Sequence, residues 1–389
     1  MDPVHNPYSP GAGRRPPELA GRDPELRRFE VPMARLEQGL TDRGLMLTGL
    51  RGVGKTVLLN EFRGRAEEGG WLVAKAEAGE GRPFRVLIAK SLNQALRSVA
   101  GRPGVRDKLR RVLAVFKAFT LRVAPDGSLA LGIDVEPSAG RADTGDLELD
   151  LTELALDLGE TARDLGIGMT ILVDEMQDLE QAELAAIAAA AHEAGQRDMP
   201  FLVVGAGLPG LPVALTEAKS YSERLFEYRS IGPLDPEAAS AALIRPAEAR
   251  SVTWSDDAAE LVLEVSAGYP YFLQVYGKST WDYAEASPLQ VEDARVGIEA
   301  GRAELDVGFY GSRWERATPS QKKYLRAIAQ GGDGPSSSSD VAKRLGRRPG
   351  DVSVARDQLM KKGLLYAPDR GTIAFTVPGM SDFIDRQEK

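Results

Sequence analysis

Eight residues near the start of the chain have the types and the spacing that phosphate binding needs. Residues 49–56 read Gly-Leu-Arg-Gly-Val-Gly-Lys-Thr, which fits the pattern G-x-x-x-x-G-K-[ST] at every position. The glycines let the backbone curl until successive N–H groups point inward and form an anion nest. Lys55 would then reach the β- and γ-phosphates of a nucleotide, and the Thr56 hydroxyl would ligate Mg²⁺. The chemistry that this pattern indicates is the binding of a nucleoside triphosphate.

The flanking residues predict the two elements that such a loop joins. Residues 45–48 are apolar enough for a buried strand, and residues 57–62 can carry the apolar face of a helix. A chance glycine turn is the alternative, but a strand, a glycine loop and a helix are the context in which the motif is functional. The loop residues that we expect to contact the nucleotide are Gly49, Gly52, Val53, Gly54, Lys55, Thr56 and Val57.

A pair of carboxylates follows a second predicted strand. Residues 169–173 read Met-Thr-Ile-Leu-Val, a short β-rich run, and Asp174 and Glu175 come directly after it. Open α/β sheets bind their ligands outside the carboxyl ends of the strands. This pair therefore looks like a Walker B motif, in which Asp174 would orient the metal and Glu175 would polarise the attacking water. An apolar run followed by Asp-Glu is a weak signal alone, and the phosphate loop upstream strengthens it.

The next predicted strand carries no polar side chain at its end. Residues 201–204 are apolar, and we expect this strand to lie between the two strands already described. Gly205, Ala206 and Gly207 follow it, so a side chain that senses the γ-phosphate at this point is doubtful. Backbone N–H groups are the alternative.

Composition excludes several other kinds of site. The chain of 389 residues is 43% hydrophobic, has no cysteine, and has only two histidines, His5 and His192. Disulfides, thiol catalysis and a Cys/His zinc site are therefore excluded. No apolar run approaches the length of a membrane span, and residues 1–17 lack the apolar segment of a secretory signal. We expect a cytoplasmic protein that makes no contact with a membrane.

The charge is distributed unevenly. The net charge is −8, but residues 317–389 hold 13 Lys and Arg against 8 Asp and Glu, which leaves this end at +5 and the remainder at −13. A basic end on an acidic body is the pattern expected when a terminal module contacts a polyanion. A solvated basic face is the alternative.

The chain divides into four predicted segments: a disordered tail over 1–20, an ATPase core over 21–234, a helical lid over 235–312, and a terminal module over 317–389. Within the core, residues 102–160 read as an insertion. This insertion holds a basic amphipathic helix over 105–118, a β-hairpin over 119–135 that turns at 126–127, and an acidic stretch over 143–157 that leads into a helix. It could serve as a contact surface for a protein partner or a neighbouring subunit, or it could be a plain elaboration of the fold.

The terminal module has the pattern of a winged helix. Helices are predicted over 318–328, 339–345 and 349–362, and a hairpin over 364–377 follows them. In this plan the third helix enters the major groove of duplex DNA, where Arg and Gln suit base edges and Arg and Lys suit phosphates. Gln358 could face a base edge. The residues that we expect at DNA are Arg347, Arg348, Ser353, Arg356, Lys361, Lys362 and Arg370. Contact with a protein, or docking on the core alone, is the alternative.

From residue 21 onward the layout resembles the AAA+ and STAND-type ATPases, in particular the archaeal and eukaryotic origin-recognition initiators and archaeal-type ATPases close to them. The resemblance implies an α/β P-loop NTPase with a parallel sheet, a small all-helical lid and a C-terminal winged helix, with ATP and Mg²⁺ as cofactors. It places Gly21 and Arg22 near the adenine or ribose, and the Gly-Tyr-Pro tripeptide in the lid, where Pro270 would contact the nucleotide. An ordinary helix start, with Asp23 as N-cap, also accounts for the first segment.

The resemblance also implies a catalytic arginine that acts between subunits of a homo-oligomer. Arg224, with Arg229 behind it, stands where ring-forming ATPases of this class carry such a residue. A surface arginine at a helix end is the alternative. His192 lies in an Ala-rich helix and is expected to be a packing or surface residue.

Three functions remain after these observations. The first is an ATP-binding and slowly ATP-hydrolysing enzyme that binds duplex DNA and acts as a loader, remodeller or initiator-like factor. The second is a STAND-like nucleotide switch whose winged helix contacts protein. A transcription regulator with a degenerate ATPase is a third and weaker hypothesis.

Overall fold

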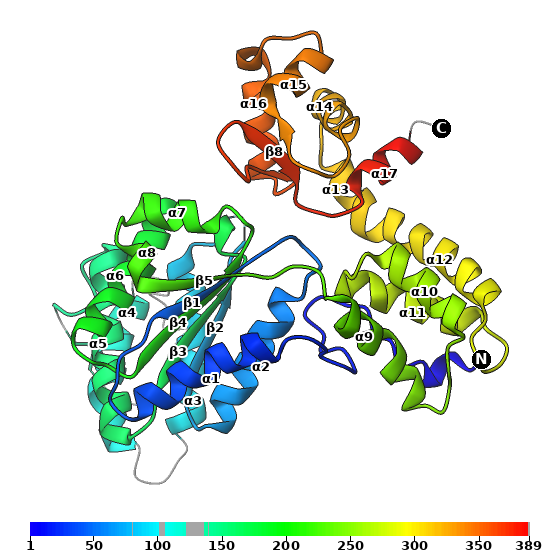
Figure 1. Ribbon diagram of the computed structural model, residues 1–389. Coiled ribbons are helices and arrows are strands. Elements are labelled where there is room, and N and C mark those ends of the chain that lie inside the picture. Colours follow the sequence, from blue (N-terminus) through cyan, green and yellow to red (C-terminus); the bar gives the residue numbers. More distant parts are fainter. Residues whose placement is uncertain (80, 101–105, 122–135, 139, 388–389) are drawn as a thin grey trace.

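The computed structural model describes residues 1–79, 81–100, 106–121, 136–138 and 140–387. The chain forms three parts: an α/β core, a bundle of helices, and a C-terminal module that lies above the junction of the other two (Figure 1). No helix in the described ranges is long and apolar enough to cross a membrane.

A five-stranded parallel sheet is the centre of the core. Its order is β2-β3-β4-β1-β5, and each neighbouring pair is parallel. The third predicted strand, β4, therefore lies between β1 and β3, as expected from the sequence. The strands are β1 (Gly44–Thr48), β2 (Leu72–Glu77), β3 (Met169–Asp174), β4 (Phe201–Gly207) and β5 (Phe226–Ser230).

Helices cover both faces of this sheet, because side chains on a strand alternate between the two faces. Leu45 and Leu47 pack with α1 and α2 on one face, whereas Met46 packs with α3 to α7 on the other. The helical segments of the core are α1 (Asp23–Glu37), α2 (Lys55–Glu68), α3 (Phe84–Ala100), α4 (Arg106–Leu121), α5 (Leu147–Leu165), η2 (Met176–Asp178), α6 (Gln181–Gln196), α7 (Leu211–Ala218) and α8 (Ser222–Leu225).

The predicted insertion over 102–160 is part of this helical layer where it is described. The apolar faces of α4 and α5 belong to the main core cluster, and α5 packs along α6. Asp157 on α5 pairs with Arg111 at 2.9 Å and with Arg141 at 2.6 Å. The start of the predicted hairpin is wrong, since residues 119–121 continue α4. The rest of that hairpin, including its turn, lies outside the described residues.

The disordered tail predicted over 1–20 is a second error. The segment begins with a short helix, η1 (Pro3–His5), and Tyr8 is only 3% exposed among the lid helices. Trp254 donates a hydrogen bond to the Tyr8 hydroxyl at 2.9 Å, and the Asn6 side chain donates to the Lys278 carbonyl at 3.0 Å. These anchors are isolated residues in a Pro- and Gly-rich segment, so no periodic pattern reveals them.

The lid packs as a compact bundle of four helices: α9 (Pro236–Glu248), α10 (Asp256–Ser266), α11 (Pro270–Tyr283) and α12 (Val291–Leu305). Asp235 caps the first of them by accepting from the Ala238 N–H at 2.8 Å. At the start of α1, by contrast, the N-cap is Arg22, and Asp23 is already helical.

A π-helical turn, η3 (Asp306–Gly311), and the short α13 (Ser312–Glu315) join the lid to the C-terminal module. That module holds three helices, a small antiparallel sheet of order β6-β8-β7, and a last helix that the sequence did not predict. Thr318 and Gln321 form a capping box at its first helix. The elements are α14 (Pro319–Ala329), β6 (Ser336–Ser337), α15 (Ser338–Arg344), α16 (Pro349–Lys361), β7 (Leu365–Tyr366), β8 (Thr372–Phe375) and α17 (Met380–Arg386).

Candidate nucleotide site

The phosphate loop joins β1 to α2 with the backbone geometry that the glycines permit. Gly52 and Gly54 have φ values of +85° and +96°, a region that side chains disfavour. Lys55 is the first residue of α2 and is 8% exposed. Its Nζ donates to the carbonyls of Gly49 at 2.8 Å and Leu50 at 2.9 Å. The ammonium is thus held over the loop, at the N-terminus of a helix, where anions bind well.

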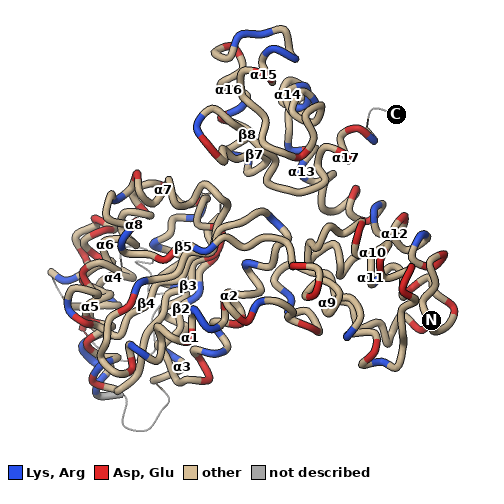
Figure 2. The backbone as a smooth tube through the Cα atoms, viewed as in Figure 1, with Lys and Arg blue, Asp and Glu red and all other residues tan. Residues whose placement is uncertain are grey.

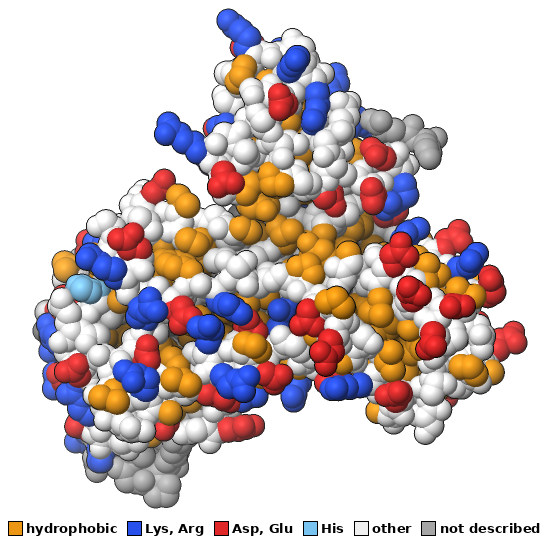
Figure 3. Space-filling view, in the orientation of Figure 1, with side chains coloured by type: hydrophobic (Ala, Val, Ile, Leu, Met, Phe, Trp, Pro, Cys, Tyr) orange, Lys and Arg blue, Asp and Glu red, His pale blue; other side chains and the backbone are white. Residues whose placement is uncertain are grey.

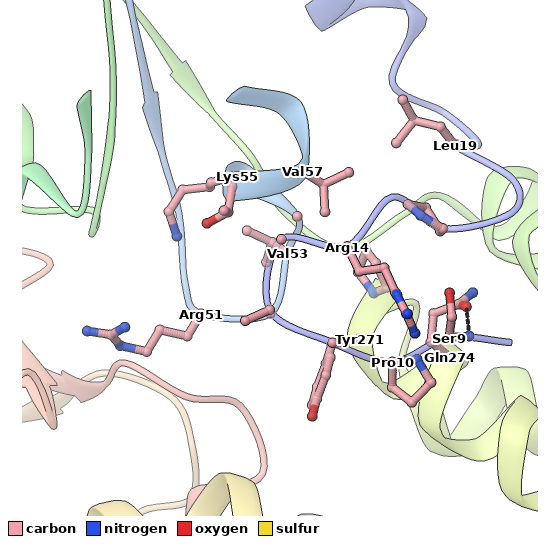
Figure 4. A pocket seen from close by; sticks show the side chains of 18 of the residues that line it. Ser9, Pro10, Arg14, Leu19, Arg51, Val53, Lys55, Val57, Tyr271 and Gln274 are labelled. Atoms are coloured by element: carbon pink, nitrogen blue, oxygen red, sulfur yellow. Dashed lines mark hydrogen bonds between the residues drawn. The ribbon is translucent and has the colours of Figure 1, made fainter. Parts of the chain in front are cut away.

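A cavity of about 310 Å³ opens beside this loop. Figure 4 shows the loop, the N-terminal segment and the lid helix α11 around it, with Arg51, Val53, Lys55, Tyr271 and Gln274 from the loop and the lid. Its volume lies at the lower end of the range for small-molecule sites. The predicted nucleotide contacts that line it are Arg22, Gly52, Val53, Gly54, Lys55, Thr56, Val57 and Pro270, together with the catalytic candidate Glu175.

The two carboxylates lie at the carboxyl end of β3, as the sheet topology requires. Asp174 is 3% exposed, and its Oδ1 accepts from the Glu175 N–H at 2.9 Å. Glu175 has a φ of +51°, which is unusual for a non-glycine residue. This backbone turn directs Glu175 into the cavity while Asp174 remains at the strand end.

Gln177 is a site residue that the sequence analysis missed. Its Nε2 donates to Glu175 Oε2, and its Oε1 accepts from the Leu208 N–H at 2.9 Å. It therefore connects Glu175 to the end of β4. A Cβ on Gly205 would meet the Met176 sulfur at 2.1 Å, and one on Gly207 would meet Gln177 Oε1 at 3.1 Å. Small residues end β4 because the 176–178 turn packs closely on it.

Arg51 is a second missed residue, although it stands inside the recognised loop. Its guanidinium pairs with Glu175 Oε1 at 2.8 Å, and both side chains are about three-quarters buried. Its backbone N–H donates to the Thr376 carbonyl in the C-terminal module at 3.0 Å. Arg51 occupies a position of the motif at which any residue is allowed. The motif therefore does not predict its contacts with Glu175 and Thr376.

The N-terminal segment forms one wall of the cavity and connects the lid to α2. The Ser9 N–H donates to Gln274 of α11 at 3.1 Å (Figure 4). Asn60 of α2 donates to the Gly13 carbonyl at 2.8 Å. A Cβ on Gly13 would lie 2.7 Å from the Thr56 methyl group, so glycine permits this close approach.

Arg22 lies at the cavity but its guanidinium is used within the protein. It donates to the Val53 carbonyl at 3.1 Å and to the Gly232 carbonyl at 2.7 Å. Burial lowers the pKa of this group. Gly21 packs on the lid instead, since a Cβ there would lie 2.5 Å from that of Ala238. Both residues thus fix the loop and the lid to each other.

The predicted arginine pair at the edge of the core is split. Arg224 is exposed at the end of α8, away from the cavity lining. Arg229 forms an ion pair with Glu25 at 3.0 Å. His192 stacks on Tyr221 with ring centroids 4.5 Å apart, which agrees with the predicted packing role.

Comparison with known families identifies the core. A family profile described as the AAA ATPase domain matches residues 18–204. These residues form an AAA ATPase domain. The predicted enzyme class, an ATPase, and the predicted α/β core are therefore confirmed. Residues 307–384 match a second profile, described as a domain of unknown function (DUF8462). Among curated proteins, no sequence match was found.

Three solved structures resemble the chain at low sequence identity. The Walker-type ATPase of Pyrococcus abyssi is 17% identical with a TM-score of 0.61, over 95% of this chain and 97% of that one. The Aeropyrum pernix Orc1 protein, solved in complex with DNA, is 17% identical with a TM-score of 0.47, over 96% and 94% of the two chains. The Thermotoga maritima RuvB Holliday junction branch migration motor is 18% identical with a TM-score of 0.46, over 93% and 96%. At this sequence identity the similarity to the Pyrococcus abyssi ATPase shows a shared fold and nothing more. The TM-scores of the other two structures are too low to support a conclusion.

The ionisation of Lys55 predicts how nucleotide binding depends on pH. Burial lowers the pKa of Lys55 to about 8. Bound phosphates favour the charged ammonium, so binding above pH 8 requires proton uptake. We expect ATP affinity to be steady below pH 8 and to fall above it by up to about tenfold per pH unit. Calorimetry at pH 7 and pH 9, in buffers of different ionisation enthalpy, measures both the affinity and the protons taken up.

The control for this experiment is Lys55→Arg. Its guanidinium stays charged through this range, so the pH dependence should flatten whatever the absolute affinity. Equal proton uptake by the wild type at pH 7 and pH 9 would contradict the assignment of Lys55.

Proposed function

We propose that the AAA ATPase domain binds ATP with Mg²⁺ in the cavity and hydrolyses it slowly. The convergence of Lys55, Thr56 and Glu175 on one cavity carries this proposal, with Asp174 behind them at the strand end. A hydroxyl and a carboxylate are the hard oxygen ligands that Mg²⁺ prefers, so Thr56 and Asp174 fit the ion. When bound, Mg²⁺ would neutralise charge that develops on the phosphates.

Residues of the chain would bind the phosphates and activate the attacking water. Loop N–H groups and Lys55 would hold the phosphates, and Glu175 would orient water and accept its proton. In the present geometry both oxygens of Glu175 are engaged, one by Arg51 and one by Gln177. Glu175 would have to leave Arg51 before it acts as the base, and we therefore expect basal turnover to be slow.

Steady-state ATP hydrolysis tests this proposal, with Lys55→Ala as the blank. Lys55→Ala should abolish nucleotide binding, because it removes the charge that meets the phosphates. Glu175→Gln should bind ATP but lower turnover by about 10²- to 10⁴-fold, the usual contribution of a general base. Retained hydrolysis in both variants would contradict the site assignment.

We further propose that the C-terminal module is a winged helix that binds duplex DNA, so that the ATPase acts as a loader, remodeller or initiator-like factor. The order helix, helix, helix, hairpin supports this plan. Lys and Arg lie at the end of the module remote from the core (Figure 2), and their side chains reach the surface there (Figure 3). Arg347, Arg348, Lys361 and Arg370 are exposed around α16 and the hairpin.

Three other residues predicted at DNA are partly engaged within the protein, and exposed Arg348 itself pairs with Asp351 at 3.3 Å. Lys362 donates to the Arg316 carbonyl at 2.8 Å and to Gln321 at 2.7 Å, and Gln321 also donates to Gln358. Ser353 donates to the Gly350 carbonyl, and Arg356 pairs with Asp357. We therefore centre the proposed DNA face on the four exposed cations and retain Ser353 and Arg356 at its margin.

Salt dependence tests DNA binding. The logarithm of the affinity falls as the logarithm of the salt concentration rises, and each phosphate contact makes this slope steeper by about 0.9. Arg347→Ala and Arg348→Ala should therefore each make the slope less steep by about that amount in a titration of labelled duplex DNA. Arg295→Ala, an equal charge change on the lid, is the matched control and should leave the slope unchanged. Binding that is absent at low salt would contradict a DNA-binding module.

One observation favours the alternative, a nucleotide switch whose winged helix contacts protein. The C-terminal module rests on the phosphate loop through the Arg51–Thr376 backbone bond, and Arg51 also holds Glu175. Arg51 therefore takes part both in the docking of the C-terminal module and in the restraint of Glu175. In this reading a protein partner that lifts the module would free the ATPase. Exposed Arg224 remains the proposed finger if either form assembles as a homo-oligomer.

Arg51→Ala tests the switch. Because about a quarter of each side chain is exposed to solvent, this ion pair is worth about 1 kcal/mol, so its loss should raise basal turnover about fivefold without DNA or partner. Arg51→Lys keeps a cation beside Glu175 and should stay near the wild-type rate. Lower turnover in Arg51→Ala would mean that Arg51 assists the reaction and would refute its restraining role.

A further inference from the structure

Arg313 brings a further positive charge to the nucleotide cavity, which Arg14, Arg22, Arg51 and Lys55 also line, from a distant part of the chain. It lies on α13, directly after the π-helical turn that joins the lid to the C-terminal module. Its side chain lines the cavity together with Arg51, Lys55 and Glu175. π-helical turns are rare and occur frequently at functional sites.

The local contacts hold this guanidinium without neutralising it. Arg313 donates to the Phe309 carbonyl, and its Cζ lies 4.7 Å from the centre of the Phe309 ring. The Phe309 ring in turn stacks on Tyr271 of the lid, with centroids 5.1 Å apart. Among the residues that the structure describes, no Asp or Glu forms an ion pair with Arg313.

Electrostatics at this position favour a bound anion. Burial, with the nearby charge of Arg51, lowers the pKa of Arg313 to about 10, and Glu175 offsets only part of this effect. A largely buried cation that lacks a carboxylate partner is unfavourable unless something else supplies negative charge. A polyphosphate in the cavity supplies that charge.

We propose that Arg313 binds the terminal phosphate of ATP, delivered in cis from the joint between the lid and the C-terminal module. Its place beside Glu175, which would orient the attacking water, points to the terminal phosphate instead of the base. A guanidinium can meet phosphate oxygens with two parallel hydrogen bonds. This inference rests on the proposed nucleotide site and goes beyond it, because the residue lies outside both nucleotide motifs and outside residues 18–204.

If Arg313 binds the terminal phosphate, the segment that joins the lid to the C-terminal module would respond to ATP hydrolysis. A ligand shifts a conformational equilibrium only when it interacts differently with the two states. Arg313 would contact ATP but lose its phosphate partner in ADP. The segment over 306–315 would then be held in the ATP state and released in the ADP state, together with the module that follows it.

The test compares the binding of a fluorescent non-hydrolysable ATP analogue and fluorescent ADP, both with Mg²⁺. Arg313→Ala should weaken binding of the ATP analogue by about 10- to 100-fold, as expected for a hydrogen bond between charged groups. ADP binding should change by less than about threefold. Arg313→Lys should recover part of the lost affinity. Arg316→Ala removes an equal charge three residues away, outside the cavity lining, and should affect neither ligand.

Thermal unfolding of each variant shows that the fold is intact, and Arg313→Gln replaces Arg313→Ala if alanine disturbs the Phe309 contact. Equal losses for the two ligands, or no loss for either, would overturn the role of Arg313 while leaving the nucleotide site standing. If the wild type binds neither ligand and Lys55→Ala changes nothing, the proposed function itself fails, and this inference fails with it.

Discussion

Positive charge held in a poorly solvated cavity is the constraint on which the rest of this structure depends. Lys55 is buried over the phosphate loop, and Arg51 and Arg313 lie in the same cavity. The carboxylates of Asp174 and Glu175 balance only part of this charge. Such an arrangement is favourable when a polyanion completes it, because desolvated charges need close partners of opposite sign. The glycines of the loop, the strand-end carboxylates and the walls of the cavity all serve that one requirement.

Three segments that are far apart in the sequence close around this charge. The N-terminal segment passes from the lid to α2, the lid contributes Tyr271 and Gln274, and the C-terminal module reaches the loop at Arg51. Each contact is small, and several are single hydrogen bonds of modest net stability. A site built in this way can change its surroundings without unfolding the core. That property suits both functions proposed here, since a remodelling ATPase and a switch each need the nucleotide to move a neighbouring domain.

The restraint of Glu175 illustrates how the site and the C-terminal module are connected. Glu175 stands in a left-handed backbone conformation, between Arg51 on one side and Gln177 on the other. Gln177 also holds the end of β4, where the strand itself carries no polar side chain. The small residues at the end of β4 therefore do not leave this part of the site without a polar group. They make room for a turn whose glutamine reaches the same place from a neighbouring strand.

The sequence by itself determined the chemistry and the class of the core. Residues 49–56 and the Asp174–Glu175 pair follow local rules: glycines for the loop, apolar runs for buried strands, and carboxylates at a strand end. The cap at Asp235 and the order of elements in the C-terminal module follow from the same kind of local pattern. Only the tertiary structure decided what surrounds these motifs. Tyr8, Gln177, Arg51 and Arg313 act through partners between 2 and more than 200 residues away, and the position of such partners depends on packing that local spacing does not encode. For the same reason composition alone predicted a disordered tail for a segment whose few buried anchors hold it against the lid.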